Sequence, residues 1–246
     1  MVFKTEAIVL YERAFTGADK LYELLTPYYG KLSVIARAAA RSNSKLAGHL
    51  QPFAHLYVMI GRGRNDHLAG VSTIQNFTAL HTSFSDFILA SSLVELILRI
   101  NVPDQAASEE FELLRSALVF MNRPGLYAHR VLVGRVFLWK LLTLAGWRPA
   151  LEQCAVCRRA LMSEDVYFDE EHGFVCGEHK TQDQHIDTEL VRFLRSFEHM
   201  RTWDELVSYA QAQREQKQWF ELSQRYYHHV IHQPIRSTAL FSYIGQ

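Results

Sequence analysis

The chain has 246 residues, with 26 basic and 26 acidic side chains and therefore no net charge. With 48% hydrophobic and 21% charged residues, the composition excludes a wholly disordered or collagen-like chain. The richest apolar run is interrupted by Arg135 and Lys140, so we expect no membrane-spanning helix. Met1–Glu6 lacks a charged leader before an apolar block, and three cysteines are too few for a disulfide scaffold. We therefore expect a cytoplasmic protein.

The first 80 residues read as five short strands separated by glycine-marked turns, which favours a small antiparallel barrel. A long polar connection, Arg41–Pro52, separates the third strand from the fourth and favours an OB-type barrel. In the first strand, alternation puts Thr5, Ala7, Val9 and Tyr11 on one face. The predicted strands are Phe3–Tyr11, Leu21–Thr26, Leu32–Ala38, Phe53–Ile60 and Leu68–Phe77.

Helical periodicity replaces this pattern after residue 80. A first helix begins near Phe84 and is closed by Pro103, and a second begins at a capping Ser108 and ends at Pro124-Gly125. A third, Leu126–Ala145, is apolar nearly all round, as in the middle of a bundle, with Gly146 as its C-cap. Three further helices are predicted over Thr188–Met200, Trp203–Gln211 and Gln216–Gln233.

These elements predict an α+β protein whose N-terminal OB-fold barrel is followed by a helical domain with an insert that carries all three cysteines. The predicted divisions are 1–80 for the barrel, 81–149 and 181–246 for the helical domain, and 150–180 for the cysteine-bearing insert.

Charge is unevenly distributed along the chain. Residues 1–82 carry nine basic and five acidic groups, a net charge of +4, which leaves −4 for the remainder. No acid lies between Glu23 and Asp66, and six bases lie in that stretch. If they share a face, they form a positive surface that suits nucleic acid; an ordinary solvated face is the alternative. The candidate DNA-binding residues are Lys31, Arg37, Arg41, Lys45, Arg62 and Arg64.

All three cysteines lie in one window, Cys154-x2-Cys157 followed by Cys176-x2-His179 after 18 intervening residues. This spacing is typical of a structural zinc knuckle, because each x2 turn directs two ligands to one point. Gly173 stands where the intervening hairpin must fold back. The spacing predicts one structural Zn²⁺ held by these four residues, while buried unligated cysteines are the alternative.

A catalytic zinc would need an open coordination position and a neighbouring base. Deaminases carry H-x-E with P-C-x-x-C, and this chain has no H-x-E. The acids between the ligand pairs, Asp169 among them, read as a solvated hairpin tip. No P-loop, dinucleotide fingerprint, nucleophile elbow or H-E-x-x-H is present, so no catalytic residue is proposed. His228 and His232 have helical i,i+4 spacing, more typical of a solvated or capping pair than of a metal site.

Several segments together resemble the start of the RecO family of bacterial recombination mediators. They include Glu6–Leu10, Asp19–Leu21, Leu24–Pro27, Tyr29–Leu32 and Ala36–Ala38, and the most specific is Ser44–Phe53, a Ser-basic-Leu segment running into Leu-Gln-Pro-Phe. The helical middle and the cysteine window follow in the expected order. His179 departs from the four-cysteine pattern of zinc-bearing members.

The resemblance implies an N-terminal OB-fold, a helical domain with a zinc knuckle, and a non-enzymatic role in RecF-pathway DNA repair. It implies binding to single- and double-stranded DNA, annealing of complementary strands without ATP, and action with RecR and SSB in loading RecA, in the cytoplasm at the nucleoid. Arg130, Arg135 and Lys140, beside many apolar residues, are the candidate site for an SSB C-terminal tail. The competing hypotheses are a zinc-dependent nucleic-acid hydrolase or deaminase, and a protein adaptor that binds acidic tails.

Overall fold

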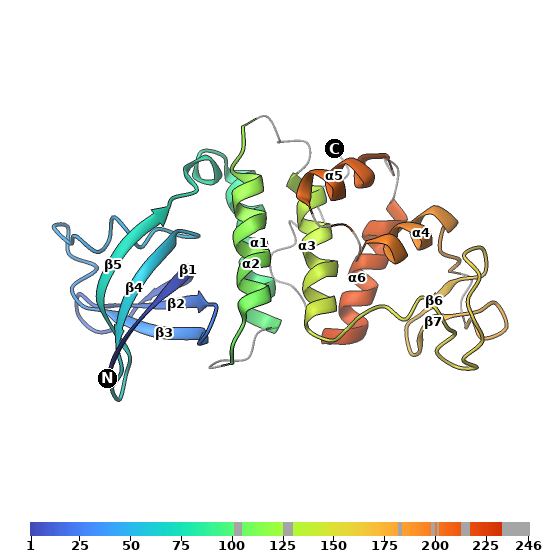
Figure 1. Cartoon of the computed structure of the whole chain (residues 1–246), viewed down its shortest axis with the longest axis horizontal. Helices are drawn as coiled ribbons and strands as arrows, with labels where there is room; N and C mark the ends of the chain where they lie inside the picture. The colour runs from blue at the N-terminus through green and yellow to red at the C-terminus, as the bar shows by residue number, and fades with distance from the viewer. Residues whose placement is uncertain are drawn as a thin grey trace. The chain divides into compact units, whose positions relative to one another are not determined.

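A computed structural model describes residues 1–100, 105–124, 130–181, 184–197, 200, 202–212 and 217–232. The chain divides into two compact units, Met1–Leu126 and Tyr127–Gln246, so the two helices after the barrel belong with it (Figure 1). The division into 1–80, 81–149, 150–180 and 181–246 expected from the sequence remains a prediction.

The first unit contains a closed five-stranded barrel in the order β1-β2-β3-β5-β4. Its strands are β1 Val2–Ala14, β2 Lys20–Thr26, β3 Gly30–Ala36, β4 His55–Gly61 and β5 His67–Gln75. Neighbours are antiparallel except β3 and β5, which meet in parallel at Ile35 and His67. Five strands with a β3–β5 closure are the OB-type barrel expected from the sequence. All five predicted strands are present, with ends displaced by at most three residues.

Alternate side chains of the strands fill the barrel because successive residues point to opposite faces. Ala7, Val9, Leu24, Val34 and Val58 belong to this buried core. Tyr11, expected on the same face as Val9, is instead 53% exposed. The β1–β2 register shifts between Val9 and Tyr11, and such a bulge reverses the alternation of the residues beyond it.

Two helices, α1 Phe84–Ile100 and α2 Ser108–Met121, complete the described part of the first unit. The prediction that Ser108 caps α2 is wrong. Ala107 occupies the N-cap position and its side chain makes no capping bond. The Ser108 hydroxyl donates to the Pro27 carbonyl at 2.9 Å, beside a 3.0 Å bond from the Ala107 amide to the same oxygen. The start of α2 is therefore tied to the β2–β3 turn. Pro103, expected to close α1, lies outside the described residues.

The second unit is built around α3 Arg130–Leu144, whose described side chains are almost all buried, as its apolar sequence predicts. Gly146 has φ +87°, and the Trp147 amide donates to the Leu142 carbonyl at 2.8 Å, so Gly146 ends the helix as expected. A hairpin of β6 Tyr167–Asp169 and β7 Gly173–Val175 follows. The remaining helices are α4 Thr188–Ser196, α5 Trp203–Ala212 and α6 Lys217–Ile231. None of the helices described is both long enough and apolar enough to cross a membrane.

Candidate nucleic-acid interface and metal centre

A groove of about 340 Å³ runs along the outer face of β3 toward the β4–β5 loop. Its lining combines three of the six predicted DNA-binding residues (Lys31, Arg62 and Arg64) with the ring of Phe15. Leu21 and Ile35, directly opposite each other in the β2–β3 register, supply its apolar part. In an OB-fold the β2–β3 face and the loops β1–β2 and β4–β5 are the usual nucleic-acid surface, and this groove lies there.

Backbone bonds fix the loops around the groove. The Phe15 amide donates to the Asp19 carbonyl at 3.1 Å and closes the β1–β2 turn, in which Gly17 has φ +60°. The Ala40 amide donates to the Ala18 carbonyl at 2.9 Å, which joins the segment after β3 to that turn. The Ile35 amide donates to the Asp66 carbonyl at 2.9 Å and attaches the β4–β5 loop to β3. Three segments far apart in sequence therefore form one edge of the barrel.

The guanidinium of Arg62 is held over two aromatic rings. Its Cζ lies 5.1 Å from the centroid of Phe3 and 5.8 Å from that of Tyr29, and the two rings are themselves 4.2 Å apart. Its Nε lies 3.7 Å from Asp66 Oδ2. These contacts orient the side chain in advance, which lowers the entropy lost when it meets a phosphate.

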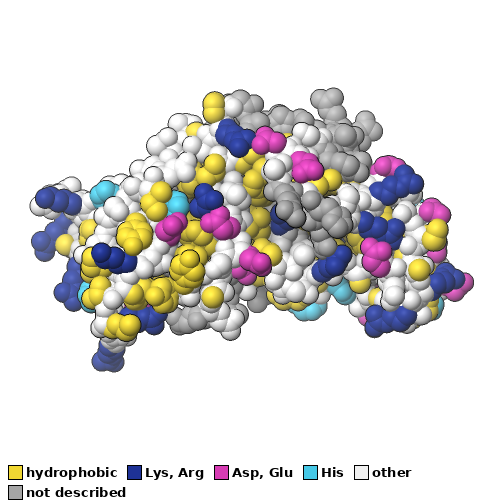
Figure 2. Space-filling model, viewed as in Figure 1, with side chains coloured by type: hydrophobic (Ala, Val, Ile, Leu, Met, Phe, Trp, Pro, Cys, Tyr) yellow, Lys and Arg dark blue, Asp and Glu magenta, His cyan; other side chains and the backbone are white. Residues whose placement is uncertain are grey.

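The six predicted cations have different surroundings. Arg37, Arg41, Lys45 and Arg64 are exposed, and none has an acidic partner within the part of the chain that is described. Arg37 and Arg41 lie in the turn that follows β3, and Lys45 lies further along the connection to β4. None of these three lines the groove. The Lys31 ammonium donates to the Leu98 carbonyl at 3.1 Å, so it is already engaged with α1. Figure 2 shows Lys and Arg side chains gathered at the outer edge of the barrel.

Three acids border this basic edge, although none lies between Glu23 and Asp66 in the sequence. Asp19 accepts a 2.7 Å bond from the Ala38 amide, in the turn that carries Arg37. Glu23 lies opposite Ser33 on the outer face of the β2–β3 pair and accepts a 2.6 Å bond from its hydroxyl. Asp66 lines the groove itself, 3.7 Å from Arg62. The positive charge is therefore concentrated at Arg37, Arg41 and Arg64.

Phe15 was not among the residues predicted from the sequence. It is 45% exposed, although it is a large apolar residue in a well-ordered turn. The signal was an aromatic residue directly before Thr16-Gly17, at a position where no buried strand face needs one.

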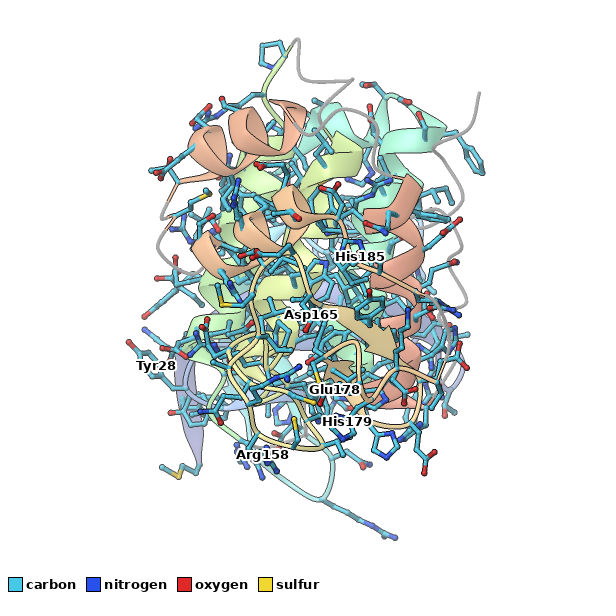
Figure 3. All side chains as sticks on the ribbon, turned by 90° about the vertical axis from the view of Figure 1, so that its right-hand side faces the viewer. Tyr28, Arg158, Asp165, Glu178, His179 and His185 are labelled. Carbon is cyan, nitrogen blue, oxygen red and sulfur yellow. The ribbon has the colours of Figure 1, made fainter. Side chains whose placement is uncertain are left out.

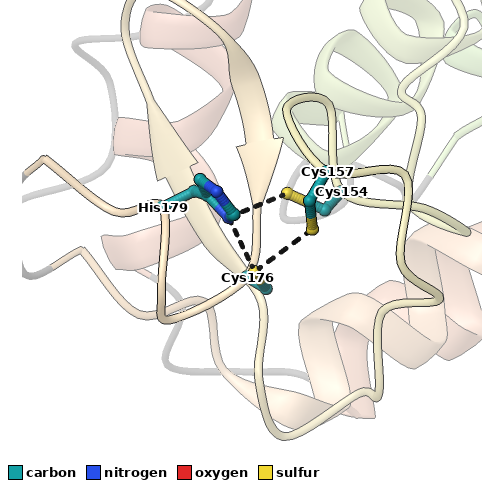
Figure 4. Close-up of side chains that lie close together, drawn as sticks. All are labelled: Cys154, Cys157, Cys176 and His179. Atoms are coloured by element: carbon teal, nitrogen blue, oxygen red, sulfur yellow. Dashed lines mark hydrogen bonds between the residues drawn. The ribbon is translucent and has the colours of Figure 1, made fainter.

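The four predicted metal ligands converge in the second unit (Figure 4). Their donor atoms all lie within 4.8 Å of one another. Cys157 Sγ is 3.9 Å from Cys176 Sγ, and His179 Nδ1 is 3.3 Å from Cys176 Sγ and 3.9 Å from Cys154 Sγ. Zn–S bonds of about 2.3 Å place the sulfurs of a tetrahedral site about 3.8 Å apart, so these donors fit a closed Cys₃His site.

Backbone groups prepare two of the three thiols, those of Cys154 and Cys176, for a cation, whereas the pKa of Cys157 is raised. Burial acts to raise the pKa of Cys154, but N–H groups of Cys157, Cys176 and Val156 outweigh it and lower that pKa. Burial is likewise outweighed at Cys176, where the Glu178 amide is the main donor and the pKa is lowered. Stabilised thiolates are the form that binds a metal.

A set of charged side chains surrounds the ligands. Arg159 Nη1 donates to Glu178 at 3.1 Å, and its Nη2 lies 3.5 Å from Asp165. Asp165 Oδ1 accepts a 3.0 Å bond from the Gly177 amide, between Cys176 and His179. Figure 3 shows Asp165, Glu178 and His179 on neighbouring loops of the knuckle. The nearest acids thus support the ligand loops.

Asp169 is not part of a solvated hairpin tip, contrary to the prediction. It is 3% exposed and accepts bonds from the amides of Glu171 and His172, from His172 Nδ1 and from the Thr181 hydroxyl. Its burial is outweighed by these donors, which hold its pKa well below the usual range of a carboxyl. The carboxylate organises the turn between β6 and β7.

Aromatic packing connects the hairpin to the helices of the second unit. Tyr226 of α6 stacks on Trp139 of α3 with ring centroids 4.9 Å apart, and it contacts Phe174 of β7 at 5.6 Å. Trp139 Nε1 donates to the Ser223 hydroxyl at 3.0 Å. The Cys₃His cluster is therefore joined, through β7, to buried aromatic side chains of α3 and α6.

The predicted partner-binding residues lie on α3. Arg135 is 4% exposed, with its guanidinium 5.3 Å from the Trp219 ring, and burial lowers its pKa to about 10. Lys140 donates to the Met200 carbonyl at 3.2 Å and lies 5.3 Å from the Phe197 ring. Arg130 begins the helix, and its side chain is outside the described residues.

The His228–His232 pair does not form a site. His228 is exposed on α6, and His232 follows the helix with φ +55°. Over the described ranges, the cluster of Cys154, Cys157, Cys176 and His179 is the one group of metal-ligating side chains found.

Two family models match this chain, and several named proteins are similar to it. The family model described as "Recombination protein O N terminal" matches residues 1–79, and "Recombination protein O C terminal" matches residues 81–239. A protein named DNA repair protein RecO from Dehalococcoides mccartyi is 31% identical over 172 residues, covering 70% of this chain and 67% of the relative. Another of that name from Syntrophus aciditrophicus is 32% identical over 167 residues, covering 67% and 63%. Because the two family models together match residues 1–79 and 81–239, this chain belongs to the RecO family.

Proposed function

We propose that this protein is a non-enzymatic mediator of recombination in RecF-pathway DNA repair, working in the cytoplasm at the nucleoid. It binds single- and double-stranded DNA, anneals complementary strands without ATP, and acts with RecR and SSB to help load RecA. Membership of the RecO family and the DNA repair names of its relatives support this role.

The observation that carries the proposal is the groove at the OB-type surface, lined by Lys31, Arg62 and Arg64 with Arg37 and Arg41 in the adjoining turn. Cations on one edge of a barrel neutralise phosphates without reading sequence. Two strands neutralised on one protein surface are brought to high local concentration, which suffices for annealing without nucleotide.

Annealing is the decisive experiment. Complementary fluorescent strands, bare or coated with SSB, should anneal faster with the protein than without it, in the absence of nucleotide and at low salt. A rate that does not respond to the protein with either substrate would contradict the proposal. Hydrolysed or deaminated strands in the same reactions would instead favour the zinc-dependent enzyme.

We propose that the Cys₃His cluster holds one structural Zn²⁺. Four protein donors leave no coordination position for a substrate, and the acids nearest the cluster, Asp165 and Glu178, are bonded to Gly177 and Arg159. Zinc bound here cross-links the two turns of the knuckle. Its place is in folding and not in annealing.

The SSB C-terminal tail is the proposed partner of the region around Arg130, Arg135 and Lys140. Because Arg135 is buried and Lys140 is bonded within the unit, an acidic tail contacting them must enter between the helices. Capture of full-length SSB but not of tail-truncated SSB tests this site. Equal capture of both would place the contact elsewhere. Binding to acidic peptides that persists in about 0.3 M salt while binding to DNA is lost would favour the adaptor hypothesis.

A further inference from the structure

The barrel exposes four large aromatic side chains: Tyr11, Phe15, Tyr28 and Tyr57. Among them, Phe15 is the one that lines the groove with the cations. No aromatic ring or cation of the described residues lies against its face. A single exposed aromatic side chain is common on protein surfaces. Phe15 differs from the other three because it shares one groove with Arg62 and Arg64, which suits a ligand that is both aromatic and anionic.

The turn that carries Phe15 is held firmly. The Phe15 amide is bonded to the Asp19 carbonyl, the Asp19 amide to the Thr16 carbonyl at 3.0 Å, and the Ala38 amide to Asp19 Oδ1 at 2.7 Å. The backbone at Phe15 is therefore fixed before a ligand binds. A ligand that covers the ring pays little backbone entropy.

The groove has two chemically different parts. Phe15, Leu21 and Ile35 are apolar, and Arg62 and Arg64 come from the β4–β5 loop. A volume of about 340 Å³ falls in the ~300–1,000 Å³ range of pockets that take small molecules. A nucleotide has the same division, with an apolar base face and an anionic phosphate.

We propose that Phe15 stacks one unpaired nucleobase while Arg62 and Arg64 bind the adjoining phosphates. The inference rests on the proposed DNA-binding function and deepens it, because it assigns the groove to single-stranded nucleic acid. In a duplex the bases are stacked on each other and offer no face to Phe15. Base–aromatic stacking is tolerant of sequence, as annealing of arbitrary strands requires.

The test uses the full-length protein and a fluorescent oligothymidylate, the same oligomer with abasic sites throughout, and a duplex. Phe15→Ala and Phe15→Leu should weaken binding to oligothymidylate at least about 5-fold. Phe15→Tyr should retain it. Binding to the abasic oligomer and to the duplex should not change. The slope of log K against log salt concentration should not change either. Tyr57→Ala removes a ring of similar exposure (46% against 45%) outside the groove and should bind like the unmodified protein.

A second measurement detects the stack directly. The chain's four tryptophans, Trp139, Trp147, Trp203 and Trp219, all belong to the second unit. Phe15→Trp therefore introduces a reporter into a barrel unit that has none, and oligothymidylate should quench it while the abasic oligomer does not. Tyr57→Trp, the matched control, should show no such difference.

The outcomes separate the two proposals. Unchanged oligothymidylate binding in Phe15→Ala, or equal loss for the normal and abasic oligomers, overturns stacking. If Phe15 stacking is overturned but Arg37→Glu/Arg41→Glu weakens DNA binding, the DNA-binding function stands without the stacking. If the unmodified protein binds none of the three probes, the proposed function itself fails.

Discussion

The amide nitrogen of Ala38 donates to the Asp19 carboxylate at 2.7 Å, although 19 residues separate them. Asp19 closes the turn that presents Phe15, and Ala38, at φ +53°, directly follows Arg37. The backbone of Asp19 therefore closes the turn that carries Phe15, while its carboxylate fixes the turn that carries Arg37 to the same residue and places a negative charge beside both.

Asp19→Ala removes the acceptor and should cost about 1–2 kcal/mol of unfolding free energy in urea titrations, since a partly buried amide loses its bond to a charged group. Asp19→Asn keeps an acceptor and removes the charge. It should be nearly as stable as the unmodified protein and bind single strands more tightly at low salt. Equal stability of both variants would show that this bond does not hold the turns.

Arg37→Glu/Arg41→Glu should weaken DNA binding and flatten the plot of log K against log salt by about one to two units, because about 0.7 counterion is released per phosphate contact on single strands. Since Lys31 is already bonded to Leu98, we expect a slope of about −3 to −4 for the unmodified protein. Lys4→Glu/Arg115→Glu makes the same change in net charge away from both the groove and the turn after β3, although it also removes the Arg115–Glu112 ion pair. An equal effect of both double variants would mean that only net charge matters.

Gly30 begins β3 with φ +61°, and a Cβ there would lie 1.9 Å from the Gln105 carbonyl oxygen. Gly30→Ala combines left-handed strain with a backbone clash and should cost well over about 2 kcal/mol or prevent folding. Gly17 has φ +60° but open space around it, so Gly17→Ala should cost only about 1 kcal/mol. If Gly30→Ala and Gly17→Ala unfold at similar urea midpoints, the Gln105 backbone has moved to make room for the added Cβ.

Cys157→Ser should release zinc and lower the thermal midpoint, because structural zinc is bound with about 10–16 kcal/mol in isolated finger peptides. His179→Cys restores a Cys₄ set and should keep the metal. Elemental analysis of the purified proteins gives the zinc content, and a chelator should destabilise the unmodified protein and His179→Cys alike. Absence of zinc from the unmodified protein would refute the structural zinc.

Asp169→Ala should destabilise the second unit by about 2–3 kcal/mol at pH 7, since several donors lose their acceptor. Because the pKa of Asp169 is held below its ordinary value of about 3.9, its contribution is present above that pH and is lost as the pH falls further. The difference from the unmodified protein, measured by urea unfolding, should therefore shrink below pH 4. Glu171→Ala, at an exposed position of the same turn, should have little effect.

Much of the local organisation could be predicted from the sequence because it depends on near neighbours. Period-two alternation placed the five strands, helical spacing placed α1 to α3, and Gly146 ended α3. The Cys-x2-Cys and Cys-x2-His turns indicated a metal cluster because each turn by itself directs two ligands to one point. Each of these patterns depends on residues that are close together in the sequence.

Long-range contacts decided the rest. Glu23 joins the basic edge only because β2 and β3 pair, and Asp169 accepts a bond from Thr181, which lies outside the β6–β7 hairpin. Phe15 lines the same groove as Arg62 and Arg64, which are more than 40 residues away in sequence, because β3 and β5 close the barrel. Such proximity depends on strand order and packing, which side-chain periodicity does not encode, so the groove that carries the proposed function was visible only in the tertiary structure.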